Sequence, residues 1–183
     1  MENSSTDSEL LEQIRNSDAD AFRTIFDRYQ PLLYRKALFQ TGQSDFAHDI
    51  VQETFIRIWL HRRSLKPQLS FLAYAFRISG NIIRDEARHR KTRQKVDPVL
   101  PPTGTSELDK PDESLQHDML GERLQEILNR KLADRCRTVF ILSRFEDKSH
   151  QEIAQLLGIS VRTVEHQISH ALKVIRRHLS DFA

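Results

Sequence analysis

Cationic side chains recur along one face of the segment from Ser70 to Lys91. If this segment is a helix that begins at Ser70, steps of four, three, four and three residues place one set on a common stripe: Arg77, Asn81, Arg84, Arg88 and Lys91. A solvated helix face normally mixes charges, because opposite charges four residues apart stabilise it. A stripe of one sign repels itself unless a polyanion neutralises it. We therefore expect this helix to lie along a phosphate backbone, and a solvated basic face is the simpler alternative.

Two aromatic residues, Phe71 and Tyr74, lie at the N-terminal end of the same helix. An aromatic ring beside a cationic groove can stack an unpaired base, so both are candidates for base capture. The side of the helix opposite the arginines is apolar and predicts a core-facing stripe, formed by Phe71, Ala75, Ile78 and Ile82 and widened by Leu72, Phe76 and Ile83.

The segment from Asp45 to about Arg62 carries more apolar surface than one core needs. Its inward face is predicted to hold Ala47, Ile50, Val51, Thr54 and Ile58. Its far side interleaves acidic and apolar residues in a pattern typical of a docking surface: Asp45, Asp49, Gln52, Glu53, Ile56, Trp59 and Leu60. The alternative is that Trp59 and Leu60 pack on the first helix of the same domain.

A third candidate surface lies near the C-terminus. Ser149 and Glu152 form a capping box, Gly158 suits the left-handed end of that helix, and Ser160 caps the next one. The last helix is expected to bury Val161, Val164, Ile168, Ala171, Leu172 and Ile175. Its outer face carries Arg162, His166, Ser169, His170, Lys173 and Arg177. This arrangement predicts a DNA-binding helix-turn-helix, with an ordinary helical hairpin as the alternative.

Helical spacing of apolar residues continues through the rest of the chain. Thr6 and Glu9 form a possible capping box for a short first helix. A second helix follows, in which Pro31 predicts a kink or a break. Gly42 is expected to end that helix, and Ser44 is expected to cap the next.

The character of the sequence changes between Thr92 and Ser114. Four of the six prolines lie in this stretch, its apolar content falls, and its second half is acidic. These features predict a flexible linker. The chain is therefore predicted to be all-α, with an N-terminal domain of three to four helices over residues 1–91, a linker over 92–114 and a four-helix C-terminal domain over 115–183. The second helix of that domain is expected to begin near Asp134.

The composition limits the class of protein. The chain has 183 residues and a formal net charge of +2, so only the distribution of charge is informative. Cys136 is the single cysteine, which argues against a disulfide framework and a cysteine-based zinc site and fits a reducing cytoplasm. The polar N-terminus does not resemble a signal peptide, and no apolar run approaches the ~20 residues of a membrane span.

Enzymes and metal sites are both disfavoured. The sequence has no glycine-rich phosphate loop and no His-Glu-x-x-His motif. His166 and His170 have a spacing that suits a metal ion, but they lie on the presumed DNA face without an evident third ligand. We expect no enzymatic activity, no metal and no cofactor. A helix-turn-helix activator with an N-terminal sensing domain is the competing class, but it leaves the arginine stripe and the face around Asp49 unexplained.

Four segments, in order along the chain, resemble the extracytoplasmic-function sigma factors, the small two-domain group of the bacterial sigma-70 family. DAFRTIFDRYQPLLYRKA, which begins at Asp20, is similar to the start of the first conserved domain. DIVQETFIRIW, which begins at Asp49, resembles the segment that docks on the largest polymerase subunit. FLAYAFRISGNIIRDEARHR, which begins at Phe71, resembles the element that reads and melts the minus-10 promoter region. The stretch from Asp134 to Leu179 is similar to the domain that reads the minus-35 region.

The sequence departs from the family pattern at two places. Tyr74 stands where the family often has tryptophan, and Leu132-Ala133-Asp134 replaces a common Leu-Pro before the next helix. Neither change removes a necessary chemical group, since a tyrosine ring can also stack on a base.

The resemblance implies a sigma factor that binds core RNA polymerase and directs promoter-specific initiation without ATP. It implies that the polymerase-binding residues are Asp49, Gln52, Glu53, Ile56 and Trp59. The melted minus-10 strand would be held by Phe71, Tyr74, Arg77, Asn81, Arg84, Arg88 and Lys91. The minus-35 duplex would be contacted by Ser160, Arg162, Thr163, His166, Gln167, Ser169, His170, Lys173 and Arg177.

Within the last helix, Arg162 and His166 are expected to read base edges, whereas Lys173 and Arg177 are expected to hold phosphates. The resemblance also implies an anti-sigma factor as a further partner, and a linker that threads through the polymerase cleft.

Overall fold

The protein is described by a computed structural model, which covers residues 5–96 and 123–180, with side chains described for 5–89 and 123–179. Every regular element in these two ranges is a helix, which confirms the all-α prediction. No helix in this part of the chain is long and apolar enough to span a membrane.

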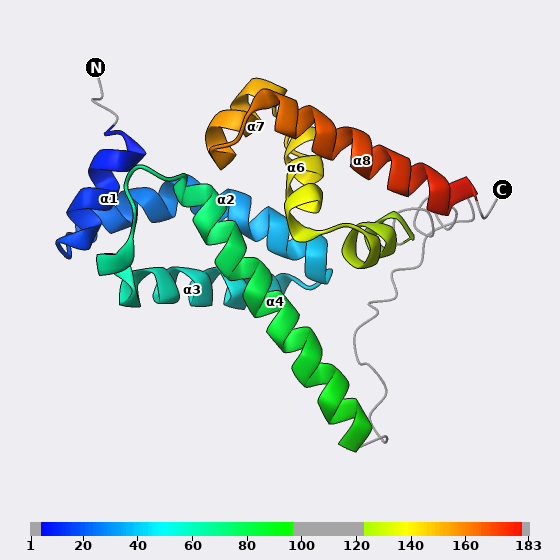
Figure 1. The fold of residues 1–183 in the computed structure, drawn as a ribbon. Helices are drawn as coiled ribbons and strands as arrows, with labels where there is room; N and C mark the ends of the chain where they lie inside the picture. The colour runs from blue at the N-terminus through cyan, green and yellow to red at the C-terminus, as the bar shows by residue number, and fades with distance from the viewer. Residues whose placement is uncertain (1–4, 97–122, 181–183) are drawn as a thin grey trace, which may run out of the picture.

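Four α-helices and one short 3-10 turn form the N-terminal part of the molecule (Figure 1). They are α1 (Asp7–Arg15), α2 (Ala19–Thr41), α3 (Ser44–Leu60), the turn η1 (Arg62–Ser64) and α4 (Phe71–Val96). Helix α2 packs against α1, α3 and α4, whereas the C-terminal half of α4 extends away from the other helices. The C-terminal part consists of helical residues 123–131 followed by α6 (Asp134–Arg144), α7 (His150–Leu157) and α8 (Val161–Ser180).

The helix ends follow the predicted caps with one exception. At the start of α1, Thr6 and Glu9 form both hydrogen bonds of a capping box, with the Thr6 amide 2.8 Å from the Glu9 carboxylate. Gly42 takes the left-handed conformation that ends α2. The prediction for α3 was wrong, because Ser44 is already helical and Gln43 precedes it without a side-chain cap.

Two further expectations need correction. Helix α2 passes through Pro31 and continues to Thr41, so the predicted break does not occur. Helix α4 continues to Val96, so residues 92–96 are its last turns rather than the start of a linker. The remaining residues of the predicted linker, and the first residues of the predicted C-terminal domain, lie outside the described part of the chain.

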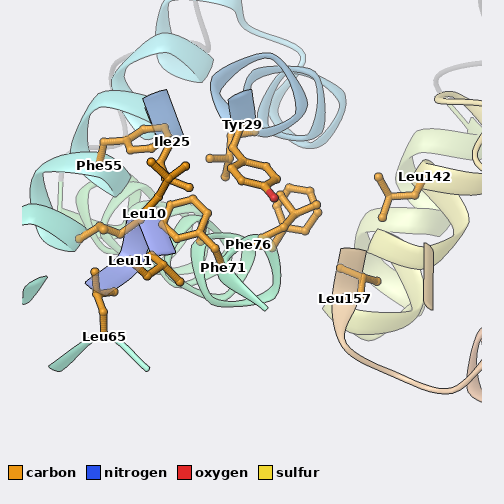
Figure 2. Packing of buried hydrophobic residues seen from close by; sticks show 14 of the residues in the cluster. Leu10, Leu11, Ile25, Tyr29, Phe55, Leu65, Phe71, Phe76, Leu142 and Leu157 are labelled. Carbon is orange, nitrogen blue, oxygen red and sulfur yellow. The ribbon is translucent and has the colours of Figure 1, made fainter. Parts of the chain in front are cut away.

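The main hydrophobic core joins the two parts of the molecule. Figure 2 shows Phe71 among Leu10, Leu11 and Ile25 of the N-terminal helices. The same cluster of buried residues includes Leu157 of α7 and other side chains of the C-terminal helices: Val139, Leu142, Ile153, Ala154, Val164 and Ile168. The N-terminal and C-terminal helices therefore share apolar surface.

Lys36 of α2 is the most unusual member of this interior. Its side chain is only 2% exposed, and its ammonium group lies 3.2 Å from the Phe76 carbonyl and 3.5 Å from a carboxylate oxygen of Asp134. Burial lowers the pKa of Lys36 to about 8, although the Asp134 carboxylate opposes this shift. Arg137 and Arg84 lower the pKa further. A buried cation of this kind weakens folding wherever it must stay protonated.

The position of Lys36 predicts a pH dependence of stability. Between pH 8 and its ordinary pKa of 10.5, Lys36 is protonated in the unfolded chain but deprotonated in the folded one. The unfolded state then binds more protons, so Lys36 makes the free energy of unfolding rise with pH, by up to about 1.4 kcal/mol per pH unit. Urea unfolding of Lys36→Met between pH 7.5 and 10.5 should therefore show a smaller rise than the wild type.

The exposed Lys66 provides the control for this measurement, because Lys66→Met should keep the wild-type pH dependence. Equal slopes for the wild type and Lys36→Met would show that Lys36 does not titrate in this window.

Candidate nucleic-acid interface

The predicted stripe on α4 exists as an exposed face. Arg77, Asn81, Arg84 and Arg88 are all exposed, whereas the side chain of Lys91 lies outside the described part. Burial of the opposite face turns these residues outward, because Leu72, Ala75 and Phe76 are nearly inaccessible to solvent: Leu72 1%, Ala75 0% and Phe76 4%.

The stripe is less isolated from polar and acidic groups than its spacing suggested. Arg84 donates a hydrogen bond to the side-chain oxygen of Asn81. Arg88 lies 3.5 Å from the carboxylate of Asp85, one turn away on the same helix. Such an exposed pair contributes little to stability, so the arginine can exchange this carboxylate for a phosphate.

Phe71 and Tyr74 have different environments. Phe71 is 2% exposed, and its ring centroid lies 5.1 Å from that of Tyr29 and 6.3 Å from that of Phe55. It belongs to the core, which leaves little of its ring accessible for stacking on an unpaired base. Tyr74 is half-buried, and the guanidinium of Arg77 lies 5.4 Å from the centre of its ring.

Tyr74 borders a pocket of about 280 Å³ at the start of α4. Arg77 of α4 lines this pocket. The loop before α4 adds Lys66 and Leu69, of which Leu69 is 58% exposed, to the wall of the pocket. These two residues were not predicted from the sequence, although the position of the loop directly before the basic helix was a usable signal. The pocket combines aromatic rings, two cations and apolar side chains, which suits a base together with its phosphate.

The helix-turn-helix is present as predicted. Ser149 and Glu152 form the capping box of α7, and these hydrogen bonds hold the pKa of Glu152 below its usual value. Gly158 has a φ of 62°, the left-handed conformation that the turn requires. The Ser160 hydroxyl accepts a hydrogen bond of 3.1 Å from the Thr163 amide and so caps α8. The turn geometry therefore fixes where α8 begins.

The two faces of α8 follow the prediction except at its first residue. Val164, Ile168, Ala171 and Ile175 are buried, but Val161 is 37% exposed and does not belong to the core. Thr163 and Gln167 are partly buried at the edge of the polar face. The remaining candidate DNA contacts are exposed: Ser160, Arg162, His166, Ser169, His170, Lys173 and Arg177.

Cys136 of α6 anchors the middle of α8. Its sulfur donates to the Gln167 carbonyl at 3.2 Å and lies 3.7 Å from the ring of His170. Burial raises the pKa of the Cys136 thiol, which makes it a packing group rather than a reactive thiolate. Within the described ranges, no three potential metal ligands gather at one place.

Helix α3 presents the predicted acidic and apolar face. Asp49 and Gln52 are exposed, as are Ile56 at 53% and Leu60 at 67%. Glu53 forms an ion pair of 2.6 Å with Arg57, one turn further along α3. The five residues of the inward face are buried as predicted: Ala47, Ile50, Val51, Thr54 and Ile58.

Trp59 is neither fully exposed for docking nor packed on the first helix, the two alternatives that the sequence left open. It is half-buried, its ring lies 4.9 Å from that of Phe22 on α2, and the Arg62 guanidinium covers it at 4.6 Å. Its packing partner is therefore α2 rather than the first helix, whereas Leu60 stays exposed. Trp59 therefore lies at the edge of the exposed face, with part of its ring packed against the domain and part accessible to solvent.

Two family models match the chain, and both describe sigma-70 proteins. The model of sigma-70 region 2 matches residues 25–93, and the model of sigma-70 region 4 matches residues 121–175. The ECF RNA polymerase sigma factor SigL of Mycobacterium tuberculosis is 30% identical over 90% of this chain and 92% of its own length. The chain belongs to the extracytoplasmic-function sigma factors of the sigma-70 family.

Other relatives support the same assignment. The ECF RNA polymerase sigma factor SigW of Bacillus subtilis is 29% identical to this sigma factor over 93% of the chain and 95% of its own length. The solved structure of CnrH in complex with the cytosolic domain of CnrY is similar in fold, with a TM-score of 0.59, 25% identity, and coverage of 97% of this chain and 99% of that one. Sigma factors are not enzymes, so the family assignment confirms the expectation that the protein has no enzymatic activity. It also replaces the alternative of a helix-turn-helix activator with a sensing domain.

The different environments of Phe71 and Tyr74 predict different effects on stability. Phe71→Ala should lower the free energy of unfolding by about 3–5 kcal/mol, because it removes a fully buried ring. Tyr74→Ala should lower it by no more than about 1–2 kcal/mol, since the half-buried ring faces a pocket. Urea unfolding monitored by circular dichroism measures both values. Equal losses would place Tyr74 in the core and remove it as a base-stacking candidate.

Proposed function

We propose that this sigma factor binds core RNA polymerase and recognises a promoter at two elements, the minus-35 element as duplex and the minus-10 element as melted single strand. The observation that carries the proposal is the start of α4, where an exposed arginine face begins beside a pocket that contains Tyr74. Arginines alone suit any phosphate backbone. A half-buried aromatic ring next to them suits an unstacked base and hence an opened strand.

Helix α8 is the proposed reader of the minus-35 element. Its candidate base readers, Arg162 and His166, are exposed and lie near the N-terminal end, which is the part of a recognition helix that reaches base edges. Lys173 and Arg177 lie two to four turns further along and are assigned to phosphates. The cap at Ser160 and the contacts of Cys136 hold this helix in a defined orientation on its support.

Helix α4 is the proposed holder of the minus-10 strand. Arg77, Arg84 and Arg88 follow one another along its exposed face, with Asn81 between them. Tyr74 stacks a flipped base at the pocket, and binding of the melted strand supplies the free energy of strand separation. Phe71 also lines the pocket, but because it is 2% exposed it supports this site mainly through the core.

The proposed polymerase-docking face consists of Asp49, Gln52, Glu53, Ile56 and Trp59. Its exposed apolar side chain at Ile56 is flanked by carboxylates, a combination that suits a basic, partly apolar partner surface. Binding to polymerase implies that the protein acts in the cytoplasm.

The division into domains follows from the same assignment. We assign residues 1–96, which include all of α4, to the domain for polymerase and the minus-10 element, and residues 115–183 to the domain for the minus-35 element. An anti-sigma factor is proposed as a further partner, because two solved structures of this fold contain a second protein. One holds the cytosolic domain of CnrY, and the other, RpoE of Bartonella quintana, holds the anti-sigma factor NepR.

The proposal is tested by transcription in vitro with purified core RNA polymerase over a library of promoter sequences. The full-length protein should select templates that share two motifs separated by a constant spacing. Transcripts that start without sequence preference, or no gain over core enzyme alone, would contradict the proposal.

The docking face predicts the effect of a charge reversal. Asp49→Lys should weaken binding to core polymerase about tenfold or more, because the exposed carboxylate is replaced by the opposite charge. Stability should stay near that of the wild type, since Asp49 is solvent-exposed. Asp27→Lys, on the exposed face of α2, serves as the matched control. Equal affinities for Asp49→Lys and Asp27→Lys would remove this face from the polymerase contact.

The assignment of α8 predicts two different patterns. Arg162→Ala should relax base preference at one minus-35 position, with a loss of about 1–3 kcal/mol on the preferred sequence. Lys173→Ala should weaken binding to all sequences similarly and reduce the salt dependence by about one phosphate contact. Binding to a set of single-base minus-35 variants at several salt concentrations measures both effects. The same pattern for the two variants would refute the division into base readers and phosphate holders.

A further inference from the structure

Glu165 is the only acidic residue of α8, and it lies in the part of the helix to which base reading is assigned. It follows Arg162 by three residues and directly precedes His166. The exposed cations of the same helix are Arg162, Lys173, Arg176 and Arg177. A carboxylate that approaches DNA meets the negative phosphates on both sides of the groove. The position of Glu165 on this face therefore needs a specific reason.

Core packing turns the Glu165 side chain outward. The preceding Val164 is 0% exposed and Ile168 is 6% exposed, and their burial fixes the rotation of α8 against α6 and α7. The cap at Ser160 and the sulfur of Cys136 hold the helix backbone on either side of Glu165. Glu165 is itself exposed, so its carboxylate projects from a helix whose orientation is fixed.

The carboxylate of Glu165 has no structural role within the described residues. It lies outside the first turn of α8, where a negative charge would stabilise the helix dipole. The residues four positions before and after it are Val161 and Ser169, and neither can form an ion pair with it. No hydrogen bond or ion pair joins its side chain to any other described residue. The other carboxylate of the helix-turn-helix, Glu152, is by contrast part of a capping box.

The base edges of the major groove differ in what they offer to a carboxylate. An ionised carboxylate can only accept hydrogen bonds. Cytosine presents its N4 amino group as a donor, whereas guanine presents the acceptors N7 and O6, and thymine presents the acceptor O4 beside a methyl group. Adenine combines an N6 donor with the N7 acceptor. A carboxylate in the groove is therefore attracted to cytosine and repelled by guanine and thymine.

We propose that Glu165 is a base reader that selects cytosine at one position of the minus-35 element by accepting a hydrogen bond from the N4 amino group. This inference rests on the proposed function, because it uses the assignment of α8 to that element. The three residues from Arg162 to Glu165 span about 4.5 Å of helix. This length is close to the ~3.4 Å between successive base pairs. The cytosine should therefore lie within one or two pairs of the base that Arg162 reads.

The same carboxylate discriminates against other sequences. Where no amino group faces it, Glu165 keeps its repulsion from the phosphates and gains no hydrogen bond in return. Glu165 thus lowers affinity for sequences without the cytosine, which is selection by an unfavourable contact with the wrong partner.

Binding of the holoenzyme, assembled from core polymerase and the full-length protein, to single-base variants of the minus-35 element tests this role. The wild type should prefer cytosine over guanine or thymine at one position by about 5- to 150-fold. Glu165→Ala should abolish most of this preference, and should raise affinity for the guanine and thymine templates because the repulsion is gone. Preferences at the other positions, including the one that Arg162 reads, should persist.

Glu165→Gln provides a second, independent readout. Glutamine has nearly the same size, but its amide both donates and accepts, and so it pairs with N6 and N7 of adenine. The preference at the same position should therefore shift from cytosine toward adenine, which loss of folding cannot produce. Asp27→Ala, on the exposed face of α2, removes an equal charge outside α8 and is the matched control. Its base preferences should equal those of the wild type.

Base preferences identical to those of the wild type in both Glu165 variants would overturn the inference. A uniform gain in affinity across all templates would also overturn it, because Glu165 would then only repel phosphates. The same conclusion would follow if the preference that is lost were for a base other than cytosine. A wild-type holoenzyme without any base preference in the upstream element would instead overturn the proposed function, and this inference with it. The wild-type measurement therefore distinguishes the two failures.

Discussion

Burial of one side of α4 is the constraint on which the rest of the structure depends. Leu72, Ala75 and Phe76 fill the core that α4 shares with α1, α2 and α3, and this packing fixes the rotation of the helix. Because side chains are rigidly spaced around a helix, the rotation also decides that Arg77, Arg84 and Arg88 face solvent. Core packing and the proposed DNA contact are thus two consequences of one helix orientation.

The same helix also carries the contact between the two parts of the molecule. Gly80 lies between the buried and the charged faces of α4, where the absence of a side chain admits Asp134. Asp134 in turn lies beside the buried ammonium of Lys36. A buried ion pair of this kind contributes little net stability, because removing two charges from water offsets their attraction.

Much of the fold and most of the exposed site residues were predictable from the sequence, because they depend on local rules. Capping residues, the left-handed Gly158 and the apolar spacing of α8 place the helix-turn-helix without reference to other segments. Local rules failed where a residue suited two environments. Phe71 fits both an apolar stripe and a base-stacking site, and only the positions of Tyr29 and Phe55 around it show that it is core.

The sequence by itself determined the helical class, the positions of the turns and the exposed basic faces of α4 and α8, since each follows from side-chain spacing within one segment. Only the tertiary structure decided that Lys36 is buried, that Gly80 receives Asp134, and that the turn before α8 rests on Ser70. These contacts join residues from about 50 to about 100 positions apart in the chain. Their partners depend on how helices pack across space, and the spacing within any single segment carries no information about that packing.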